Sequence, residues 1–240
     1  PDGEVERIAE EAWRESMAPP PVEAAAKTPV VRKEVLPNGI RVIVRENRAV
    51  PVVAVEAAFL GGVRAEPAEK NGISMIVAEM LTKGTKERTA AEISEAVENM
   101  AADLGGFSGR NSFGLQAKFM RKDIEQGFRL FTESLREPVF PAGELEKKRQ
   151  EVLGKLKRQK DNLTQSAFLL FLATHYGDHP YARNPLGREE TVLGITRADL
   201  VGFYERWSDP KNLVIVVSGD IGADEALTVI RKAFGDFPPR

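Results

Sequence analysis

The sequence predicts an α+β domain with a mostly antiparallel β-sheet covered by helices. Segments with apolar residues at every second position alternate with segments whose apolar residues recur every three to four positions, and these are the periods of strands and helices. The strand-like segments include a tight hairpin, and the helix-like segments occur in pairs or threes instead of singly between strands. With 240 residues, of which 42% are hydrophobic and 29% charged, the chain is large enough to bury a core.

The first thirty residues differ in composition from the rest. Residues 4–17 carry apolar residues at helical spacing with acidic residues around them, which predicts a short amphipathic helix. Prolines at 19, 20, 21 and 29 then favour an extended, semi-rigid linker. We therefore expect a helix and linker over residues 1–30 and a single folded domain over residues 31–240.

The folded domain is predicted to begin with three strands. Residues 32–36, "RKEVL", and residues 40–46, "IRVIVRE", flank a turn in which Asn38 and Gly39 both tolerate positive φ, so they form a hairpin. Residues 52–62 are apolar enough to lie inside a sheet.

The remaining elements are predicted by the same two periods. A helix covers residues 71–82, and a second begins after Thr89, which forms a capping box with Glu92. The run "GGFSGRNSFGLQAKFM" predicts two strands around a polar turn, and "NLVIVVSGDI" predicts a late strand. The predicted helices after the first cover residues 89–102, 121–137, 141–160, 163–176, 196–207 and 223–234.

Composition excludes several classes of function. The 34 Lys and Arg residues nearly balance the 36 Asp and Glu residues, so no basic field is available to hold a nucleic acid. The absence of cysteine removes disulfides, thiolate zinc sites and thiol catalysis. No apolar run approaches the roughly 20 residues of a membrane span. We expect a soluble chain with no nucleic-acid or membrane partner, and the composition leaves its compartment, periplasmic or cytoplasmic, open.

Six segments in a fixed order resemble the pitrilysin/insulinase family of zinc peptidases, which includes the mitochondrial processing peptidases. They are "LPNGIRVIVREN", "PVVAVEAAFLGGVRAEP", "NGISMIVAEMLTKGT", "FPAGELEKKRQEVLGKLKRQKDN", "HPYARNPLG" and "NLVIVVSGDI". Together they cover about residues 31–238. The resemblance implies a clamshell of two halves, each made of two related α+β domains, and this chain resembles the first domain of one half.

Active members of that family carry an inverted His-x-x-Glu-His motif on the helix that corresponds to residues 71–82. Residues at i and i+4 share a helix face and both reach a zinc ion, while the glutamate at i+3 deprotonates the metal-bound water. Here Met75 and Glu79 stand at the positions of the two histidines, and Ala78 stands at that of the general base. Lys155 stands at the position of the third ligand, a glutamate on a later helix.

These four residues do not suit zinc catalysis. A thioether is too soft and neutral to replace imidazole, alanine cannot accept a proton, and an ammonium repels a dication. We therefore expect no catalytic, metal-binding or cofactor-binding residue in this chain, and we expect Glu79 and Lys155 to form an ion pair where the metal would lie. The apolar residues of the same helix are expected to face the core: Ile73, Ile76, Val77, Met80 and Leu81.

A second zinc-like pattern, "HYGDH", contains His175, Asp178 and His179. Gly177 lies inside it and Pro180 follows it, so we expect a helix to end there and the i, i+4 geometry to be lost. The resemblance assigns this stretch to a structural loop.

The resemblance implies a non-catalytic domain of a zinc metalloendopeptidase, which shapes the peptide-binding chamber for an active half elsewhere. Zinc would belong to that half, on the same polypeptide or on a partner subunit, and residues 1–30 would be the end of a preceding half. The alternative is a scaffold or peptide-binding protein resembling inactive processing-peptidase subunits. A His-x-x-Glu-His motif upstream in the same reading frame would favour the first function, and its absence would favour the second.

Overall fold

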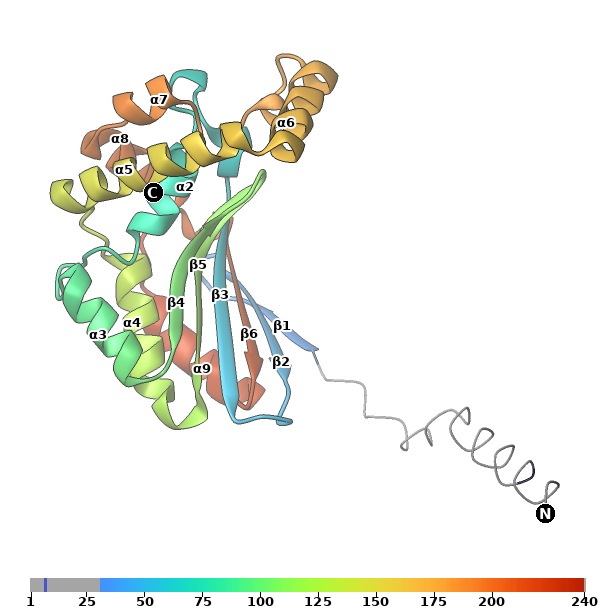
Figure 1. The fold of residues 1–240 in the computed structure, drawn as a ribbon. Helices are drawn as coiled ribbons and strands as arrows, with labels where there is room; N and C mark the ends of the chain where they lie inside the picture. The colour runs from blue at the N-terminus through green and yellow to red at the C-terminus, as the bar shows by residue number, and fades with distance from the viewer. Residues whose placement is uncertain (1–6, 8–30, 240) are drawn as a thin grey trace. The chain divides into compact units, whose positions relative to one another are not determined.

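The computed structural model describes residue 7 and residues 31–239. Its centre is a six-stranded sheet with the order β1-β2-β6-β3-β5-β4 (Figure 1). The helix and linker predicted over residues 1–30 lie outside the described residues, apart from Arg7. The strands are β1 (Val31–Val35), β2 (Arg41–Glu46), β3 (Val52–Leu60), β4 (Asp103–Ser108), β5 (Ser112–Met120) and β6 (Leu213–Gly219).

The predicted hairpin is confirmed. β1 and β2 pair antiparallel, with Val35 opposite Arg41, and Gly39 in the turn between them has a φ of 94°. The Asn38 side chain donates from Nδ2 to the carbonyl of Phe234, 2.7 Å away, which ties the turn to the C-terminal helix. The turn residues therefore set both the strand pairing and a contact with the end of the domain.

Four of the five strand pairs are antiparallel, as the sequence predicts, and the pair of β2 with β6 is parallel. β6 lies between β2 and β3, with Leu213, Ile215 and Val217 fully buried on one face of the sheet. An apolar strand of this kind is stable in the interior of a sheet because both neighbours satisfy its backbone.

Eight α-helices lie in the described part of the chain, and Figure 1 places α4 and α9 against the sheet and α2, α5, α7 and α8 together at one end of it. The helices predicted within residues 31–239 are confirmed, including the capping box of Thr89 and Glu92. α7 was not predicted, because six residues are too few to display a period. The helices are α2 (Ile73–Met80), α3 (Ala90–Asn99), α4 (Ile124–Arg136), α5 (Ala142–Asp161), α6 (Leu163–Tyr176), α7 (Glu189–Gly194), α8 (Arg197–Trp207) and α9 (Ala223–Phe234).

Helix α2 packs directly on edge strand β4. A Cβ atom added at Gly106 would lie 1.8 Å from the carbonyl oxygen of Ala78, so only glycine permits this approach. At the neighbouring Gly105 an added Cβ would meet nothing within 4 Å. Gly106 thus sets the distance between the sheet and the helix that carries the candidate site.

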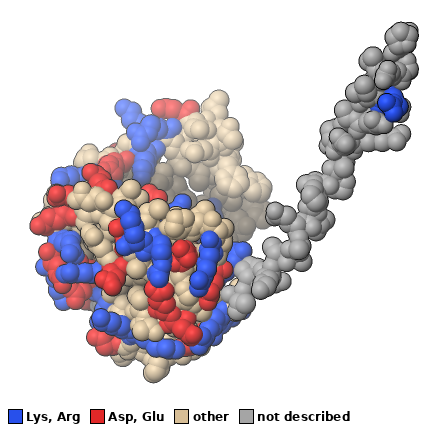
Figure 2. All heavy atoms as spheres, turned by 90° about the horizontal axis from the view of Figure 1, so that it is seen from below, with Lys and Arg blue, Asp and Glu red and all other residues tan. Residues whose placement is uncertain are grey.

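The surface carries both signs of charge. Lys and Arg side chains are interspersed with Asp and Glu over the face drawn in Figure 2, in keeping with a net charge of −2. Within the described residues, no helix combines the length and the apolar character that crossing a bilayer requires.

Candidate functional site, the position of the family's zinc centre

The start of α2 is held by a buried carboxylate. Glu66 is 4% exposed and accepts hydrogen bonds from the backbone N–H groups of Gly72 and Ser74, at 2.8 and 3.0 Å. It also accepts from Asn71 Nδ2 at 2.7 Å and from the Ser74 hydroxyl. An anion at this end satisfies free N–H groups and opposes the positive end of the helix dipole. Glu66 therefore fixes where α2 begins, and sequence reasoning did not identify it.

The apolar residues of α2 face the core, as predicted: Ile73, Ile76, Val77, Met80 and Leu81 are all at most 2% exposed. Ala78, which the resemblance places at the general base, is fully buried. Met75, which the resemblance places at the first histidine, is partly buried against the core. Neither side chain carries a group that accepts a proton, so these two side chains contribute packing.

Glu79 forms the ion pair that the sequence predicts, and it forms a second one. Its Oε1 lies 3.2 Å from Lys155 Nζ, and its Oε2 lies 3.0 Å from Lys148 Nζ. The side chains of Glu79, Lys155 and Lys148 are 26%, 40% and 10% exposed. The carboxylate from α2 is thus held between two ammonium groups, seven residues apart on α5, and we call these three residues the Glu79 cluster.

Lys148 is also paired with Glu151, one turn further along α5. Burial is the largest influence on the pKa of Lys148 and acts to lower it, but Glu151 and Glu79 together act more strongly and leave that pKa above its ordinary value. The same contact with Lys148 holds the pKa of Glu151 below its ordinary value. The Lys148 ammonium and the Glu151 carboxylate therefore both carry charge at neutral pH.

The residues at this position do not fit a divalent metal. The Glu79 carboxylate already contacts two lysine ammonium groups, and zinc would have to displace both. Among residues 31–239, no group of three or more His, Cys, Asp or Glu side chains is placed to hold a metal ion. The arrangement ties α2 to α5 electrostatically.

The second pattern, "HYGDH", does not form a helical pair of ligands. α6 ends at Tyr176, and Gly177 follows it with a φ of 53°. His179 lies in the next turn, where its Nδ1 accepts from the backbone N–H of Tyr181 at 3.2 Å. The predicted helix end is confirmed, and His179 caps a short 3₁₀ turn (Pro180–Ala182).

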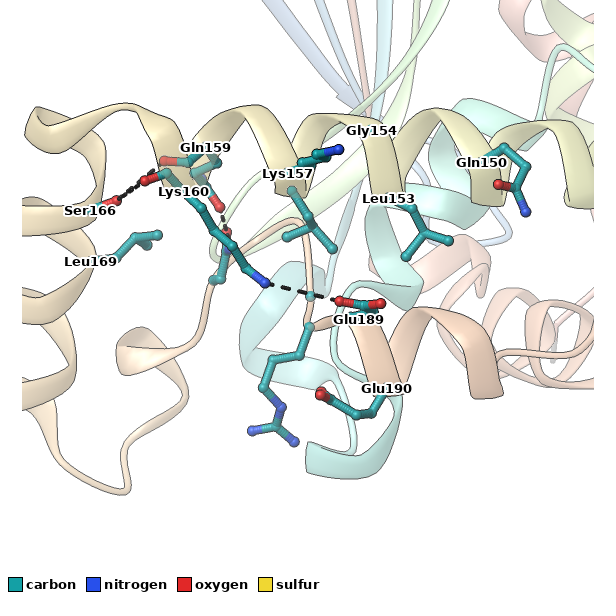
Figure 3. Close-up of a pocket in the computed structure, with 14 residues that line it drawn as sticks. Gln150, Leu153, Gly154, Lys157, Gln159, Lys160, Ser166, Leu169, Glu189 and Glu190 are labelled. Carbon is teal, nitrogen blue, oxygen red and sulfur yellow. Dashed lines mark hydrogen bonds and ion pairs between the residues drawn. The ribbon is translucent and has the colours of Figure 1, made fainter.

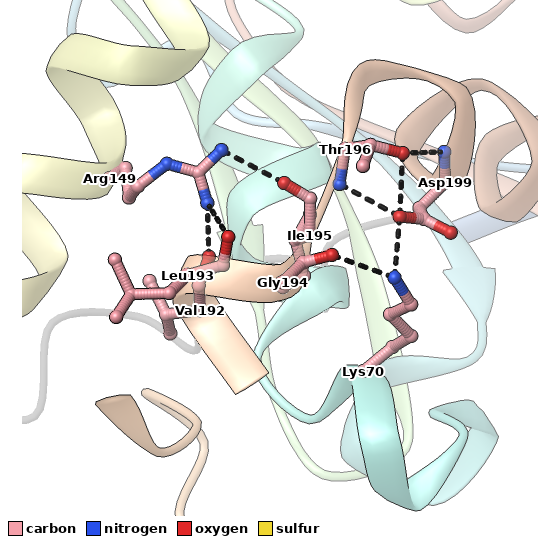
Figure 4. A network of polar contacts seen from close by, with 8 residues as sticks. All are labelled: Lys70, Arg149, Val192, Leu193, Gly194, Ile195, Thr196 and Asp199. Carbon is pink, nitrogen blue, oxygen red and sulfur yellow. Dashed lines mark hydrogen bonds and ion pairs between the residues drawn. The ribbon is translucent and has the colours of Figure 1, made fainter. Parts of the chain in front are cut away.

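Two sets of polar contacts meet at the end of α7 (Figure 4). Arg149 of α5 donates to the carbonyl oxygens of Leu193 and Ile195, each at 2.9 Å. Lys70 donates to the carbonyl of Gly194 at 2.8 Å and pairs with Asp199 at 2.7 Å. These donors satisfy carbonyl groups that the short helix leaves free. Arg149 thereby ties α5 to the end of α7, and Lys70 ties the end of α7 to α8.

A pocket of about 850 Å³ lies between α5, α6 and α7 (Figure 3). Leu153, Leu156 and Leu169 supply its apolar lining, and Lys160 faces Glu189 across it at 4.0 Å. None of the Glu79 cluster lines it. The pocket is therefore separate from the candidate site.

The i, i+4 spacing of Glu144 with Lys148 and of Glu151 with Lys155 predicts a solvent-exposed face with two ion pairs on α5, and the structure differs from this prediction. Lys148 is 8% exposed, and Glu151 pairs with it at i, i+3 instead of with Lys155. Lys148 could have been suspected from its position seven residues before Lys155, since two turns bring both onto one helix face. Its burial depends on α2, which the local sequence of α5 does not specify.

Comparison with protein families places the chain among peptidases. The model described as "Insulinase (Peptidase family M16)" matches residues 41–189, more than half of the chain. The model described as "Peptidase M16 inactive domain" matches residues 194–240. The chain therefore belongs to peptidase family M16.

Similar proteins include zinc proteases and a processing peptidase subunit. An uncharacterized zinc protease of Mycobacterium leprae is 28% identical over 211 residues, which are 88% of this chain and 47% of that protein. The mitochondrial-processing peptidase subunit beta of Rattus norvegicus is 27% identical over 223 residues, which are 93% of this chain and 45% of that subunit. The chain spans about half the length of the curated relatives it matches.

Solved structures share the fold. The peptidase M16 inactive domain from Pseudomonas fluorescens aligns with a TM-score of 0.82 and 24% identity, covering 88% of this chain and 52% of that one. The periplasmic protease PqqL from Escherichia coli aligns with a TM-score of 0.80 and 22% identity, covering 89% of this chain and 25% of that one. At these identities the alignments establish the α+β fold.

Proposed function

We propose that this chain is a non-catalytic domain of an M16 zinc metalloendopeptidase and that it helps to form the peptide-binding chamber of an active half. The observation that carries the proposal is the Glu79 cluster. Two lysines occupy the space around the carboxylate where the family places zinc and its third ligand. The site is thereby converted from a metal centre into a contact between α2 and α5.

The chamber role is supported by the edge and the open face of the sheet. β4 is the last strand of the sheet, and Gly106 packs it against α2. A shallow pocket of about 620 Å³ lies on the face of the sheet opposite α2, lined by residues of β3, β4, β5 and β6 that include Glu56, Gln116 and Lys118. An edge strand next to a polar surface of this kind is suited to contact extended peptides. In the proposed function these surfaces contact substrate, while bond cleavage takes place on the active half.

Zinc binding by the purified chain tests the catalytic part of the proposal. We expect equilibrium dialysis against ZnCl2, followed by elemental analysis, to find no stoichiometric zinc on the wild-type chain. The combined variant Met75→His, Ala78→Glu, Glu79→His and Lys155→Glu should bind about one zinc per chain, because three ligands then converge at the family's spacing. One zinc on the wild-type chain, lost in Glu79→Ala but kept in the control Glu190→Gln, would refute the proposal.

Peptide hydrolysis tests the supporting role. The second component is the His-x-x-Glu-His polypeptide encoded in the same frame or beside it, and the probe is an internally quenched peptide of about 15 residues. We expect no hydrolysis by this chain alone, and a rise in kcat/KM of about tenfold or more when it is added to the active half. Chelator-sensitive hydrolysis by this chain alone would contradict the proposal, and so would an unchanged kcat/KM on mixing. If no such polypeptide is encoded, the scaffold function replaces this one.

A further inference from the structure

Helix α6 is unusual among the described helices in its exposed side chains. Its 14 residues, "LTQSAFLLFLATHY", contain no Asp, Glu, Lys or Arg. Only Leu172 is buried, although uncharged helices rich in large apolar residues are normally enclosed by protein. Figure 1 places α6 at the edge of the domain, beyond α5.

The exposed apolar side chains of α6 form one patch. Half of the large apolar side chains that are exposed in the described residues belong to this helix. Phe168 stacks on Phe171 with ring centroids 6.3 Å apart, and Phe171 stacks on His175 at 5.4 Å, so the aromatic rings form a continuous row. We call the following residues the α6 patch, with their exposed fractions: Leu163 84%, Phe168 57%, Leu170 69%, Phe171 56% and Tyr176 38%.

The α6 patch is as large as the largest apolar patches that monomeric proteins usually expose, and such patches are often functional. If a full side chain of this size offers about 200 Å², these fractions amount to roughly 600 Å². That area is at the upper limit of the largest apolar patch on typical monomeric proteins. The patch is therefore an interaction surface.

We infer that the α6 patch binds the α6 patch of a second copy of this chain, with the two helices antiparallel about a twofold axis. Two such patches bury roughly 1,200 Å², which is the lower limit for specific protein interfaces. The absence of charged residues on α6 means that a copy meets no like-charge repulsion, and an antiparallel pair also opposes the two helix dipoles. This inference does not depend on the proposed function.

The twofold geometry makes a specific prediction about Phe171. It lies near the midpoint of α6, between Phe168 and Leu170 on the patch, so the axis brings it against Phe171 of the other copy. If Phe171 is replaced by a charged residue, that residue faces an identical charge across the axis and the two copies repel each other. If one copy carries a negative residue there and the other a positive one, the two charges attract.

Sedimentation equilibrium from about 2 to 200 µM tests the inference. We expect the wild-type chain to form dimers with a micromolar dissociation constant, as fits an interface of this size. Phe171→Glu and Phe171→Lys should each weaken self-association by about 100-fold or more, whereas an equimolar mixture of the two variants should regain dimers. The control is Leu193→Glu on α7, a leucine exposed to 55%, which should associate like the wild type.

A wild-type chain that stays monomeric at 200 µM would overturn the inference and leave the patch to a different partner. Equal loss of dimers in Leu193→Glu would overturn the assignment to α6, and failure of the mixture to associate would overturn the twofold arrangement. Far-UV circular dichroism of each variant must match the wild type.

Crosslinking supplies an independent measurement that does not disturb the patch. The chain has no cysteine, so a single Ala167→Cys variant presents one thiol, on the exposed side of α6. A short bis-maleimide should link two copies of this variant at 20 µM. The matched variant Ala198→Cys, on an exposed position of α8, should stay unlinked. Equal crosslinking of both variants would contradict the inferred interface.

Discussion

Replacement of Glu66 by glutamine should destabilise the domain more than any other single-atom change near the candidate site. The carboxylate has two oxygens, and each accepts two hydrogen bonds: Oε2 from Asn71 and Gly72, and Oε1 from the backbone and hydroxyl of Ser74. A glutamine keeps one acceptor oxygen and presents an NH2 group to the donors that surrounded the other. At least one backbone N–H then becomes buried and unsatisfied.

The expected loss of unfolding free energy follows from the number of hydrogen bonds that Glu66 accepts. Hydrogen bonds to a charged group contribute about 1.5–3 kcal/mol each, and a buried unsatisfied donor costs a further 1–3 kcal/mol. Because the Ser74 hydroxyl can rotate to accept from the new NH2 group, we expect a total of about 3 kcal/mol. For a domain of this size that loss lowers the Tm by roughly 6–12 °C.

Urea unfolding followed by far-UV circular dichroism measures this loss. The control is Glu69→Gln, an exposed carboxylate in the neighbouring turn, which should change the unfolding free energy by less than about 0.5 kcal/mol. A loss below about 1 kcal/mol for Glu66→Gln, or equal losses for the two variants, would show that Glu66 does not anchor α2.

Three further outcomes follow from the packing and charge of the same region. Gly106→Ala should lower the unfolding free energy, measured in urea, by about 3 kcal/mol or more, because the new methyl group meets the Ala78 carbonyl. The control Gly105→Ala should lower it by less than about 1 kcal/mol. Equal effects of the two variants would contradict the close approach of α2 to β4. The raised pKa of Lys148 means that the charged amine stabilises the fold below its unfolded pKa of about 10.4, and that this contribution disappears as pH rises through the higher folded pKa. The unfolding free energy of the wild type should therefore fall relative to that of Lys148→Met between about pH 10 and 12, and the two should keep a constant difference between pH 6 and 9. If the difference in unfolding free energy stays constant over the whole range, the ion pairing of Lys148 is refuted. Thr89→Ala should cost about 1 kcal/mol by thermal unfolding, since it removes the N-cap of α3, and an unchanged Tm would contradict the capping box.

Local sequence predicted most elements of this fold because their signals are local. The Asn38–Gly39 turn and the Thr89 cap depend on neighbouring residues only, and both occur where expected. The insertion of β6 between β2 and β3 depends on residues about 170 positions apart, which no periodicity encodes. The prediction of mostly antiparallel pairing was confirmed, but the one parallel pair had no sequence signal.

The residues of the candidate site also fall into two groups, those that the sequence predicted and those that it did not. Glu79 and Lys155 were predicted to pair because the family's ligand spacing brings their positions together, and they do. Lys148 and Glu66 were missed because their roles depend on burial by other elements, and each would look like a solvent-exposed charge in its own segment. The sequence thus did not predict which charged residues of the site become buried by tertiary packing.

Anomalous diffraction at the zinc edge, from crystals soaked in about 1 mM ZnCl2, tests the central claim most directly. The account predicts no anomalous peak between α2 and α5, with Glu79 still paired to Lys148 and Lys155. A peak at about 2.0–2.2 Å from a Glu79 carboxylate oxygen, with the lysines turned away, would contradict it.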